Sequence, residues 1–225
     1  MNEKQCVAIE AAKYVENDML VGLGTGSTAN FFIQELARRQ QEENLKICTV
    51  ASSSISAIKA KQVGLKITAI EQISNIDLYV DGADEITPDK TLLKGRGYDL
   101  VREKLLAKAA TRFIVVADKS KLVNRIGSHF AIPIEVMPFA WLATKHSLEM
   151  LGGQGDLRPN AAKDGLCITS YGSLVLDMYF DPNHSIETLN QQLNNTPGII
   201  EHGIFYQLAH TILIAENGVV EKYHN

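Results

Sequence analysis

Short apolar runs alternate with amphipathic segments through the first half of the chain. The runs MLVGL, KICTVA, DLYV and FIVVA predict strands, and the segments around 2–16, 27–39, 55–63 and 98–110 predict helices. Strands that alternate with helices are typical of a parallel sheet. LVGL and FIVVA are apolar throughout, which indicates that helices cover both faces of this sheet. We therefore expect an α/β fold with a doubly wound core sheet.

The pattern changes after about residue 130. A strand at IPIEV, a helix over 138–151, a hairpin over 166–180, a helix near 185–194 and a strand at GIIEHGIF predict an α+β arrangement. The final run TILIAENGVVEKY is predicted to return to the main sheet. We therefore divide the chain into a core, 1–128 with 206–225, and a smaller α+β subdomain, 129–205.

Four polar clusters, GTGST, SSS, DGADE and DKSK, each come directly after a predicted strand. The carboxyl ends of parallel strands lie at one edge of a sheet, and ligands of such sheets bind at that edge. The clusters are therefore predicted to converge on one rim and to form the ligand site there.

Composition and charge exclude several classes of protein. The chain is 45% hydrophobic, which is enough for a buried core, and its net charge of -4 comes without a basic stripe that would bind nucleic acid. Its three cysteines, Cys6, Cys48 and Cys167, form no CxxC pair, so a reducing compartment is expected. No apolar run approaches the ~20 residues of a membrane span. We expect a cytoplasmic protein without membrane or nucleic-acid partners.

The first cluster lies in a glycine-rich turn between a strand and a helix, where Gly22, Gly24 and Gly26 precede Ser27 and Thr28. Glycine lets backbone N–H groups approach a ligand, and Ser27 or Thr28 could cap a helix whose N-terminus favours an anion. The spacing is G-x-G-x-G rather than G-x-G-x-x-G, and no GxxxxGK[ST] occurs, so a nucleotide cofactor is disfavoured. A tight turn with a capping serine is the alternative.

The acidic turn DGADE places Asp81, Asp84 and Glu85 at the end of an apolar strand. Carboxylates this close repel one another, and such clusters are seldom retained without a function or positive partners. The alternative is an Asx-type turn that caps the next segment. A metal would need further ligands, and no HxH or HExxH occurs, so we expect no metal.

Two further charged residues follow this turn along the chain. Lys94 lies between an apolar pair and the glycine loop 95–97, where it could neutralise a developing oxyanion or simply be solvated. Glu103 lies in a predicted helix, where its spacing alone is equally compatible with a surface ion pair.

The set GTGST, YVDGADE, LLKGxG, REK and ADxSK, in this order, resembles the ribose-5-phosphate isomerase A family. The resemblance covers most of the chain and includes IPIEV, LGG, NTPGII and EHGIF. It implies a Rossmann-like core with a ferredoxin-like α+β subdomain and a homodimer or tetramer. It also implies the interconversion of ribose 5-phosphate and ribulose 5-phosphate in the pentose phosphate pathway, without cofactor or metal.

The resemblance also implies roles for individual residues. Glu103 would be the general base that moves a proton between carbons 1 and 2 through an enediolate. Asp81 would assist ring opening, while Asp84 and Lys94 would hold the hydroxyls and Lys94 would stabilise the enediolate. The substrate-binding set would be Thr25, Gly26, Ser27, Thr28, Asp81, Gly82, Ala83, Asp84, Lys94, Gly95, Arg96, Gly97 and Lys121.

The chain departs from the family pattern at two places. The family commonly has KGGGAALTREK, whereas this chain has KGRGYDLVREK, so Arg96 and Tyr98 add bulk. Arg96 could turn outward or bind the phosphate, or the added bulk could narrow the pocket. A non-catalytic or divergent sugar-phosphate-binding protein is therefore the alternative; an acyl-CoA transferase is disfavoured because the chain is short. The chain also has Thr-Ser-Tyr-Gly at 169–172, where the family commonly has Thr-Asp-Asn-Gly.

Overall fold

The computed structural model describes residues 2–223, which divide into two compact units. The first unit comprises the described residues up to Ala83, Arg102–Lys121 and those from Gln207 onward. The second comprises Asp84–Val101 and Leu122–Tyr206. These units group 84–101 with the α+β part, whereas the sequence-based division assigns that segment to the core. The sequence-based domain boundaries stay a prediction.

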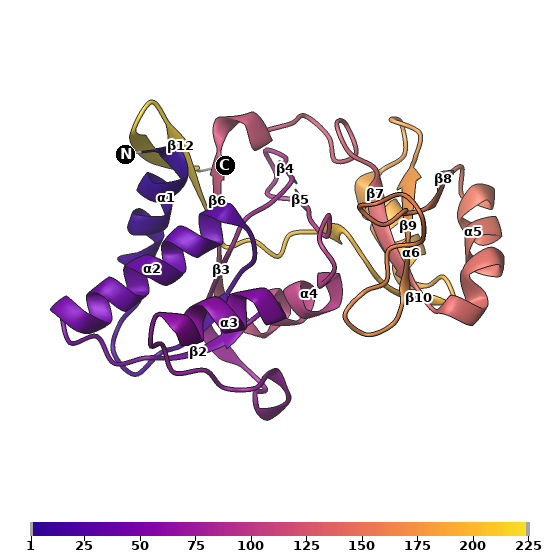
Figure 1. Ribbon diagram of the computed structural model, residues 1–225. Helices are drawn as coiled ribbons and strands as arrows, with labels where there is room; N and C mark the ends of the chain where they lie inside the picture. Colours follow the sequence, from indigo (N-terminus) through magenta and orange to yellow (C-terminus); the bar gives the residue numbers. More distant parts are fainter. Residues whose placement is uncertain (1, 224–225) are drawn as a thin grey trace. The chain divides into compact units, whose positions relative to one another are not determined.

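The first unit is built on a six-stranded sheet with the order β13-β12-β6-β3-β1-β2. Figure 1 labels β12, β6, β3 and β2 of this sheet. All neighbours are parallel except β13, which pairs antiparallel with β12. This confirms the predicted parallel sheet and the return of the last apolar run to it. The strands are β1 (Leu20–Leu23), β2 (Cys48–Ala51), β3 (Ile76–Asp81), β6 (Ala110–Asp118), β12 (Thr211–Glu216) and β13 (Val219–Tyr223).

The helical segments of this unit are α1 (Glu3–Ala12), α2 (Ser27–Glu42), α3 (Ser54–Gln62), most of α4 (Leu100–Ala109), and the short 3₁₀ segments Ile70–Gln72 and Lys119–Lys121. One face of the sheet packs its buried aliphatic side chains, such as Leu23 and Val80, against α1 and α2. Because side chains alternate along a strand, Gly22, Tyr79 and Phe113 face the other side, where the two rings stack with centroids 4.9 Å apart.

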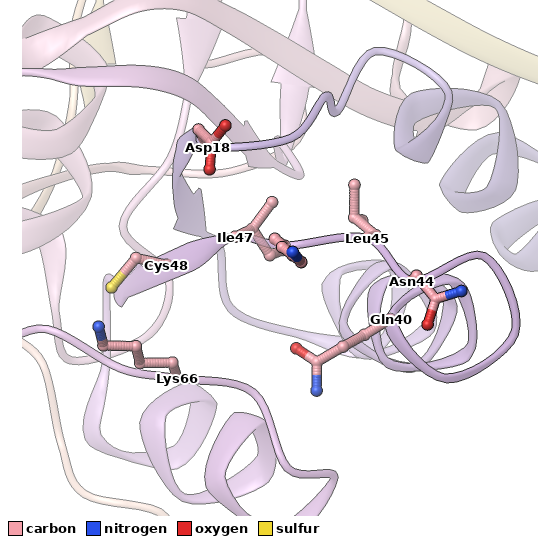
Figure 2. A pocket seen from close by; sticks show the side chains of 8 residues that line it. Asp18, Gln40, Asn44, Leu45, Ile47, Cys48 and Lys66 are labelled. Atoms are coloured by element: carbon pink, nitrogen blue, oxygen red, sulfur yellow. The ribbon is translucent and has the colours of Figure 1, made fainter.

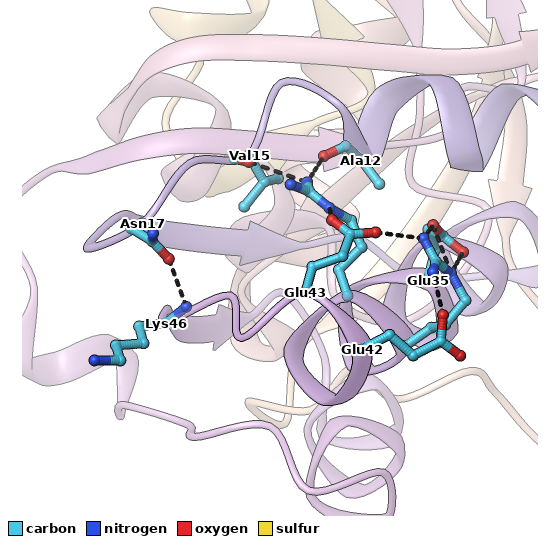
Figure 3. A network of polar contacts seen from close by, with 9 residues as sticks. Ala12, Val15, Asn17, Glu35, Glu42, Glu43 and Lys46 are labelled. Atoms are coloured by element: carbon cyan, nitrogen blue, oxygen red, sulfur yellow. Dashed lines mark hydrogen bonds and ion pairs between the residues drawn. The ribbon is translucent and has the colours of Figure 1, made fainter.

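In the polar network between the end of α1 and α2 (Figure 3), Arg39 is the residue that reaches α1. Its Nη1 donates to the carbonyl oxygens of Ala12 and Val15, the latter at 3.0 Å, while Nε donates to Glu43 at 2.8 Å. Carbonyls at a helix C-terminus lack partners within the helix, so the guanidinium satisfies the end of α1. The sequence pattern predicted a helix that extends to residue 16, but α1 ends at Ala12.

The second unit contains a four-stranded antiparallel sheet with the order β10-β7-β9-β8. Its chain order of strand, helix, two strands, helix and strand is the ferredoxin-like arrangement. Buried side chains of both helices, including Leu148 and Leu193, join the sheet residues Ile134 and Leu176 in one core. The elements are β7 (Ile132–Val136), the 3₁₀ turn Pro138–Ala140, α5 (Trp141–Met150), β8 (Gln154–Leu157), β9 (Leu174–Tyr179), α6 (Ile186–Asn194) and β10 (Ile199–His202).

A small three-stranded antiparallel sheet, β11-β5-β4, completes the second unit. It consists of β4 (Glu85–Ile86), β5 (Leu92–Leu93) and β11 (Ile204–Phe205). β4 begins at Glu85, the last residue of the acidic turn, and β5 directly precedes Lys94 and the predicted substrate loop. The α/β fold class expected from the sequence is therefore confirmed.

We expect Arg39→Ala to lower the free energy of unfolding by about 2 kcal/mol, because a charged donor to two carbonyls is lost. Arg38→Ala is the matched control: Arg38 pairs with Glu35, Glu42 and Glu43 on an exposed surface, where ion pairs contribute little. Urea denaturation of both variants measures the difference. Equal losses would show that Arg39 has no particular role at the end of α1.

Candidate active site

The strand order of the first sheet creates a switch point at β1. The chain passes from β1 to β2 on one side and reaches β3 on the other, the order typical of flavodoxin-like sheets. Residues 24–28 and 52–54, which follow β1 and β2, and Asp81, the last residue of β3, therefore lie at one edge of the sheet. The predicted convergence of the strand-end polar clusters is confirmed for this unit.

Asp81 ends β3 with its side chain fully buried. Oδ1 accepts hydrogen bonds from the N–H groups of Thr25 at 3.0 Å and Gly82 at 2.8 Å. Oδ2 accepts from the hydroxyl of Tyr79 at 2.5 Å, two residues earlier on the same face of the strand. A Cβ on Gly24 would lie 2.1 Å from Oδ1, so only glycine allows the loop to approach this carboxylate.

A cluster of three buried serines supports the glycine loop from β2 and α3. The hydroxyl of Thr25 lies 2.9, 2.7 and 3.2 Å from the hydroxyls of Ser52, Ser53 and Ser56. Ser56 also donates to the carbonyl oxygen of Gly24 at 2.7 Å. The run SSS was visible in the sequence as a strand-end cluster, but Ser56 was not, because its contact with Gly24 spans 32 residues. The cluster fixes the backbone that Asp81 contacts.

The start of α2 differs from the prediction that Ser27 or Thr28 caps the helix. Gly26 occupies the N-cap position with φ 108°, and no side chain caps the helix. Such a backbone conformation strains any residue with a side chain, so glycine displaces the usual cap residue. The Ser27 hydroxyl instead accepts a hydrogen bond from Nζ of Lys4 at 2.9 Å. Lys4 thus brings positive charge to a helix N-terminus that already favours anions.

Glu103, in the first turn of α4, is only 7% exposed, so it is not the surface ion-pair residue that its spacing allowed. Burial and the negative charges of Asp81 and Glu103 raise the pKa of Tyr79 well above its usual value. The charges of both predicted catalytic carboxylates of the first unit therefore raise the pKa of the same phenol. Tyr79 was missed by the sequence analysis because an apolar strand gives its hydroxyl no distinctive pattern.

Lys121 and the residues after Asp81 occupy the same edge of this sheet. Lys121 lies half-buried in the short turn that follows β6, and Gly82 and Ala83 follow β3 directly. The neighbouring Lys119 forms an ion pair at 2.9 Å with Glu216, the last residue of β12. The strand-end position predicted for the DKSK cluster is confirmed.

The acidic turn continues into the second unit, where its carboxylates separate. Glu85 is fully buried and accepts from the N–H groups of Gly127 and His129, both at 2.6 Å, and of Phe130 at 3.1 Å. Glu85 therefore anchors the turn 127–130, so its buried carboxylate has a structural role. The backbone N–H of Asp84 donates to the carbonyl of Leu93 at 2.8 Å.

Lys94 is also buried, with 4% exposure, so it is not a solvated residue at a strand end. Its backbone N–H donates to the carbonyl of Gly203 at 2.9 Å, and its Nζ lies 5.6 Å from the centre of the Phe205 ring. A Cβ on Gly203 would lie 2.4 Å from the carbonyl oxygen of Lys94. Lys94 is therefore fixed at its backbone by a close approach that only glycine permits.

The two segments that depart from the family pattern, the loop that contains Asp99 and the turn 169–172, contact one another within the second unit. The hydroxyl of Ser170 donates to the Asp99 carboxylate at 2.7 Å. An aspartate at position 170, as the family commonly has, would place two negative charges together. Arg96 stacks on the ring of Phe130, with 3.8 Å from Cζ to the ring centre. Its position is thus set by an aromatic side chain of its own unit.

A separate cleft of about 520 Å³ lies at the opposite edge of the first sheet (Figure 2). Its lining includes Asp18, Ile47 and Lys66, and the first two lie just before β1 and β2.

Within residues 2–223, no group of three or more His, Cys, Asp and Glu side chains is placed to hold a metal ion. None of the helices in that range is both long and apolar enough to span a membrane.

The fold and the buried carboxylates at its switch point define an α/β protein with a Rossmann-like core and a ferredoxin-like second sheet. The family model of ribose 5-phosphate isomerase A (phosphoriboisomerase A) matches residues 48–218. The chain belongs to this family, as the sequence motifs predicted.

Its relatives support this assignment over nearly the whole chain. Ribose-5-phosphate isomerase A of Thermosynechococcus vestitus is 42% identical over 214 residues, covering 95% of this chain and 91% of the relative. The structure of the Methanocaldococcus jannaschii enzyme matches with a TM-score of 0.92 at 35% identity, covering 99% of this chain and 98% of that one. A D-ribose-5-phosphate isomerase in complex with phospho-erythronic acid matches with a TM-score of 0.94 at 36% identity, covering 100% of both chains.

The raised pKa of Tyr79 predicts a dependence of stability on alkaline pH. Above about pH 10, the usual pKa of a tyrosine, the unfolded chain loses the Tyr79 proton while the folded protein keeps it. The unfolded state then binds fewer protons, so this group lowers the free energy of unfolding by up to about 1.4 kcal/mol per pH unit above pH ~10.

The test compares wild type with Tyr79→Phe by urea denaturation between about pH 9 and 11. The variant should lose less stability over this range than wild type. Tyr179→Phe, at a tyrosine that is 54% exposed, should keep the wild-type dependence. Identical pH dependences for wild type and Tyr79→Phe would contradict the proton retention.

Proposed function

We propose that this chain is an aldose-ketose isomerase that interconverts D-ribose 5-phosphate and D-ribulose 5-phosphate. The observation that carries the proposal is the burial of Glu103 and Asp81 beside one phenol at the carboxyl end of β3. The names of the relatives and the sugar-acid phosphate bound by one of them support a five-carbon sugar phosphate as substrate.

Glu103 is proposed as the general base. In the open-chain aldose it takes the proton from carbon 2, which leaves an enediolate across carbons 1 and 2. The hydroxyl proton moves from the oxygen on carbon 2 to the oxygen on carbon 1, and the same carboxyl group returns its own proton to carbon 1, which forms the ketose. The step neither adds nor removes electrons overall, so it requires no redox cofactor. A positioned acid–base group typically contributes ~10²–10⁴-fold to the rate.

Three other residues assist this proton transfer. Asp81 is proposed to accept a hydroxyl proton during opening of the sugar ring. Lys94 carries the positive charge that stabilises the enediolate oxygen, a contribution that is often larger than proton transfer itself. Asp84 holds the substrate hydroxyls together with Lys94.

The substrate phosphate and hydroxyls are proposed to bind the residues that the family motifs indicate. The segment Thr25–Thr28 is assigned to the phosphate because it leads into the N-terminus of α2, a position that favours phosphate. The N–H of Thr25 itself donates to Asp81, so the backbone donors proposed for the phosphate are those of Gly26, Ser27 and Thr28. We add Lys4 to this group because it donates to Ser27 there. The remaining contacts are assigned to Gly82, Ala83, Gly95, Arg96, Gly97 and Lys121.

We also propose that the protein acts in the cytoplasm, as a homodimer, in the non-oxidative pentose phosphate pathway, and without metal. The unpaired cysteines and the chemistry of the isomerisation support the compartment and the absence of a cofactor. A non-catalytic sugar-phosphate-binding protein is the second candidate, favoured by the bulk of Arg96 and Tyr98 in the predicted substrate loop.

Glu103→Gln is expected to lower kcat for ribose 5-phosphate by ~10²–10⁴-fold, since the amide cannot accept the proton. Binding should persist, which thermal stabilisation by ribose 5-phosphate measures. Glu42→Gln, at an exposed glutamate of α2, is the matched control and should keep full activity. The rate of wild type should be the same with and without a chelator.

Two outcomes would decide against the proposal. Turnover of Glu103→Gln at the wild-type rate would remove the residue from its role as the base. Wild-type protein that is stabilised by ribose 5-phosphate but never converts it would establish the non-catalytic alternative.

A further inference from the structure

Arg158 follows β8 directly, and hydrogen bonds of both its side chain and its backbone hold it within the second unit. Its Nε and Nη2 donate to the two carboxylate oxygens of Asp177 on β9, at 2.8 and 2.6 Å. Its backbone N–H donates to the carbonyl of Val175, and its carbonyl accepts from the N–H of Cys167, both at 2.8 Å. The side chain is only 14% exposed. A bidentate pair of this kind fixes the plane of the guanidinium.

The one terminal nitrogen that Asp177 does not engage is directed at the predicted substrate loop. Nη1 of Arg158 lies 3.2, 3.3 and 3.1 Å from the carbonyl oxygens of Gly95, Arg96 and Gly97. Three successive carbonyls of the loop therefore converge on one cationic donor. Two of these three residues are glycines, which have the largest conformational freedom to lose on ordering.

The orientation of the carbonyls determines where the loop amides point. The described chain contains no cis peptide bond, and in a trans peptide the N–H points away from the preceding C=O. The N–H groups of Arg96, Gly97 and Tyr98 therefore face away from Arg158. Within residues 2–223, no protein atom accepts a hydrogen bond from these three N–H groups. A row of N–H groups directed to one side is a common receptor for anionic oxygen.

We propose that Arg158, oriented by Asp177, is a positioning residue for substrate binding. It holds the carbonyls of 95–97 on one side so that the amides of 96–98 are presented to the oxygen atoms of the sugar phosphate. This inference rests on the proposed function, which assigns the loop to the substrate. Arg158 itself touches the loop and not the reacting atoms, so its effect is on the affinity for substrate.

Lysine cannot replace arginine in this arrangement. A lysine retains the charge and can pair with Asp177, but its single nitrogen cannot both bind two carboxylate oxygens and reach three carbonyls. Arg158→Lys therefore preserves the ion pair of the sheet while it releases the loop. A role limited to stabilising β8 and β9 would be largely maintained by this variant, and a role in positioning the loop would not.

The experiment compares wild type, Arg158→Lys and Asp177→Asn in steady-state kinetics with ribose 5-phosphate. We expect KM to rise roughly tenfold in Arg158→Lys while kcat changes by less than about threefold, because contacts made equally in ground and transition states are lost. Asp177→Asn should raise KM by a smaller factor. Arg125→Lys is the matched control, since Arg125 donates to the carbonyl of Asp181 elsewhere in the same unit. Its KM should not change.

Hydrogen exchange of the segment 95–99 supplies a readout that does not depend on activity. Exchange there should be faster in Arg158→Lys than in wild type and unchanged in Arg125→Lys. An unchanged KM together with unchanged exchange in Arg158→Lys would overturn the inference. Wild type without turnover would overturn the proposed isomerase instead, and faster exchange of the loop in Arg158→Lys would still establish the positioning of the loop.

Discussion

The buried carboxylate of Asp81 is the constraint on which the first unit's site depends. It joins β3 to the loop after β1, because its oxygens accept from the N–H groups of Thr25 and Gly82 and from the Tyr79 hydroxyl. The contact exists only because Gly24 has no Cβ. Burial of a carboxylate costs free energy unless such donors surround it, so the position of Asp81 depends on Gly24 and on the three donors together.

Both glycine-rich loops are ordered by donors that come from elsewhere in the chain. Glycine permits the close approach of a ligand but offers no side chain to hold its own backbone. In the first unit, Ser56 donates to the carbonyl of Gly24. In the second, Arg158 donates to the carbonyls of 95–97. In each case the donor holds the carbonyls, and the N–H groups of the same peptides point the other way. The N–H of Thr25 donates to Asp81, and those of 96–98 are proposed to face the substrate.

The acidic turn shows how one sequence cluster can serve two purposes. Asp81 is held at the end of the parallel sheet beside Tyr79, whose raised pKa keeps it a hydroxyl donor. Glu85 is enclosed by backbone N–H groups of 127–130 and has become a structural anchor. The repulsion expected from the sequence is thus reduced by giving each carboxylate its own donors.

The sequence by itself determined the parallel sheet, the later α+β segment and the family, because apolar periodicity and strand-end polar clusters are local features of the chain. It also gave Asp81, Lys94 and Glu103 as candidate catalytic residues, but it could not decide whether Lys94 and Glu103 were surface residues. Only the tertiary structure decided their burial, the loss of the expected serine cap on α2, and the contacts of Lys4 and Arg158. Those contacts span 23 and about 62 residues, and they depend on strand order and register, which no local pattern encodes.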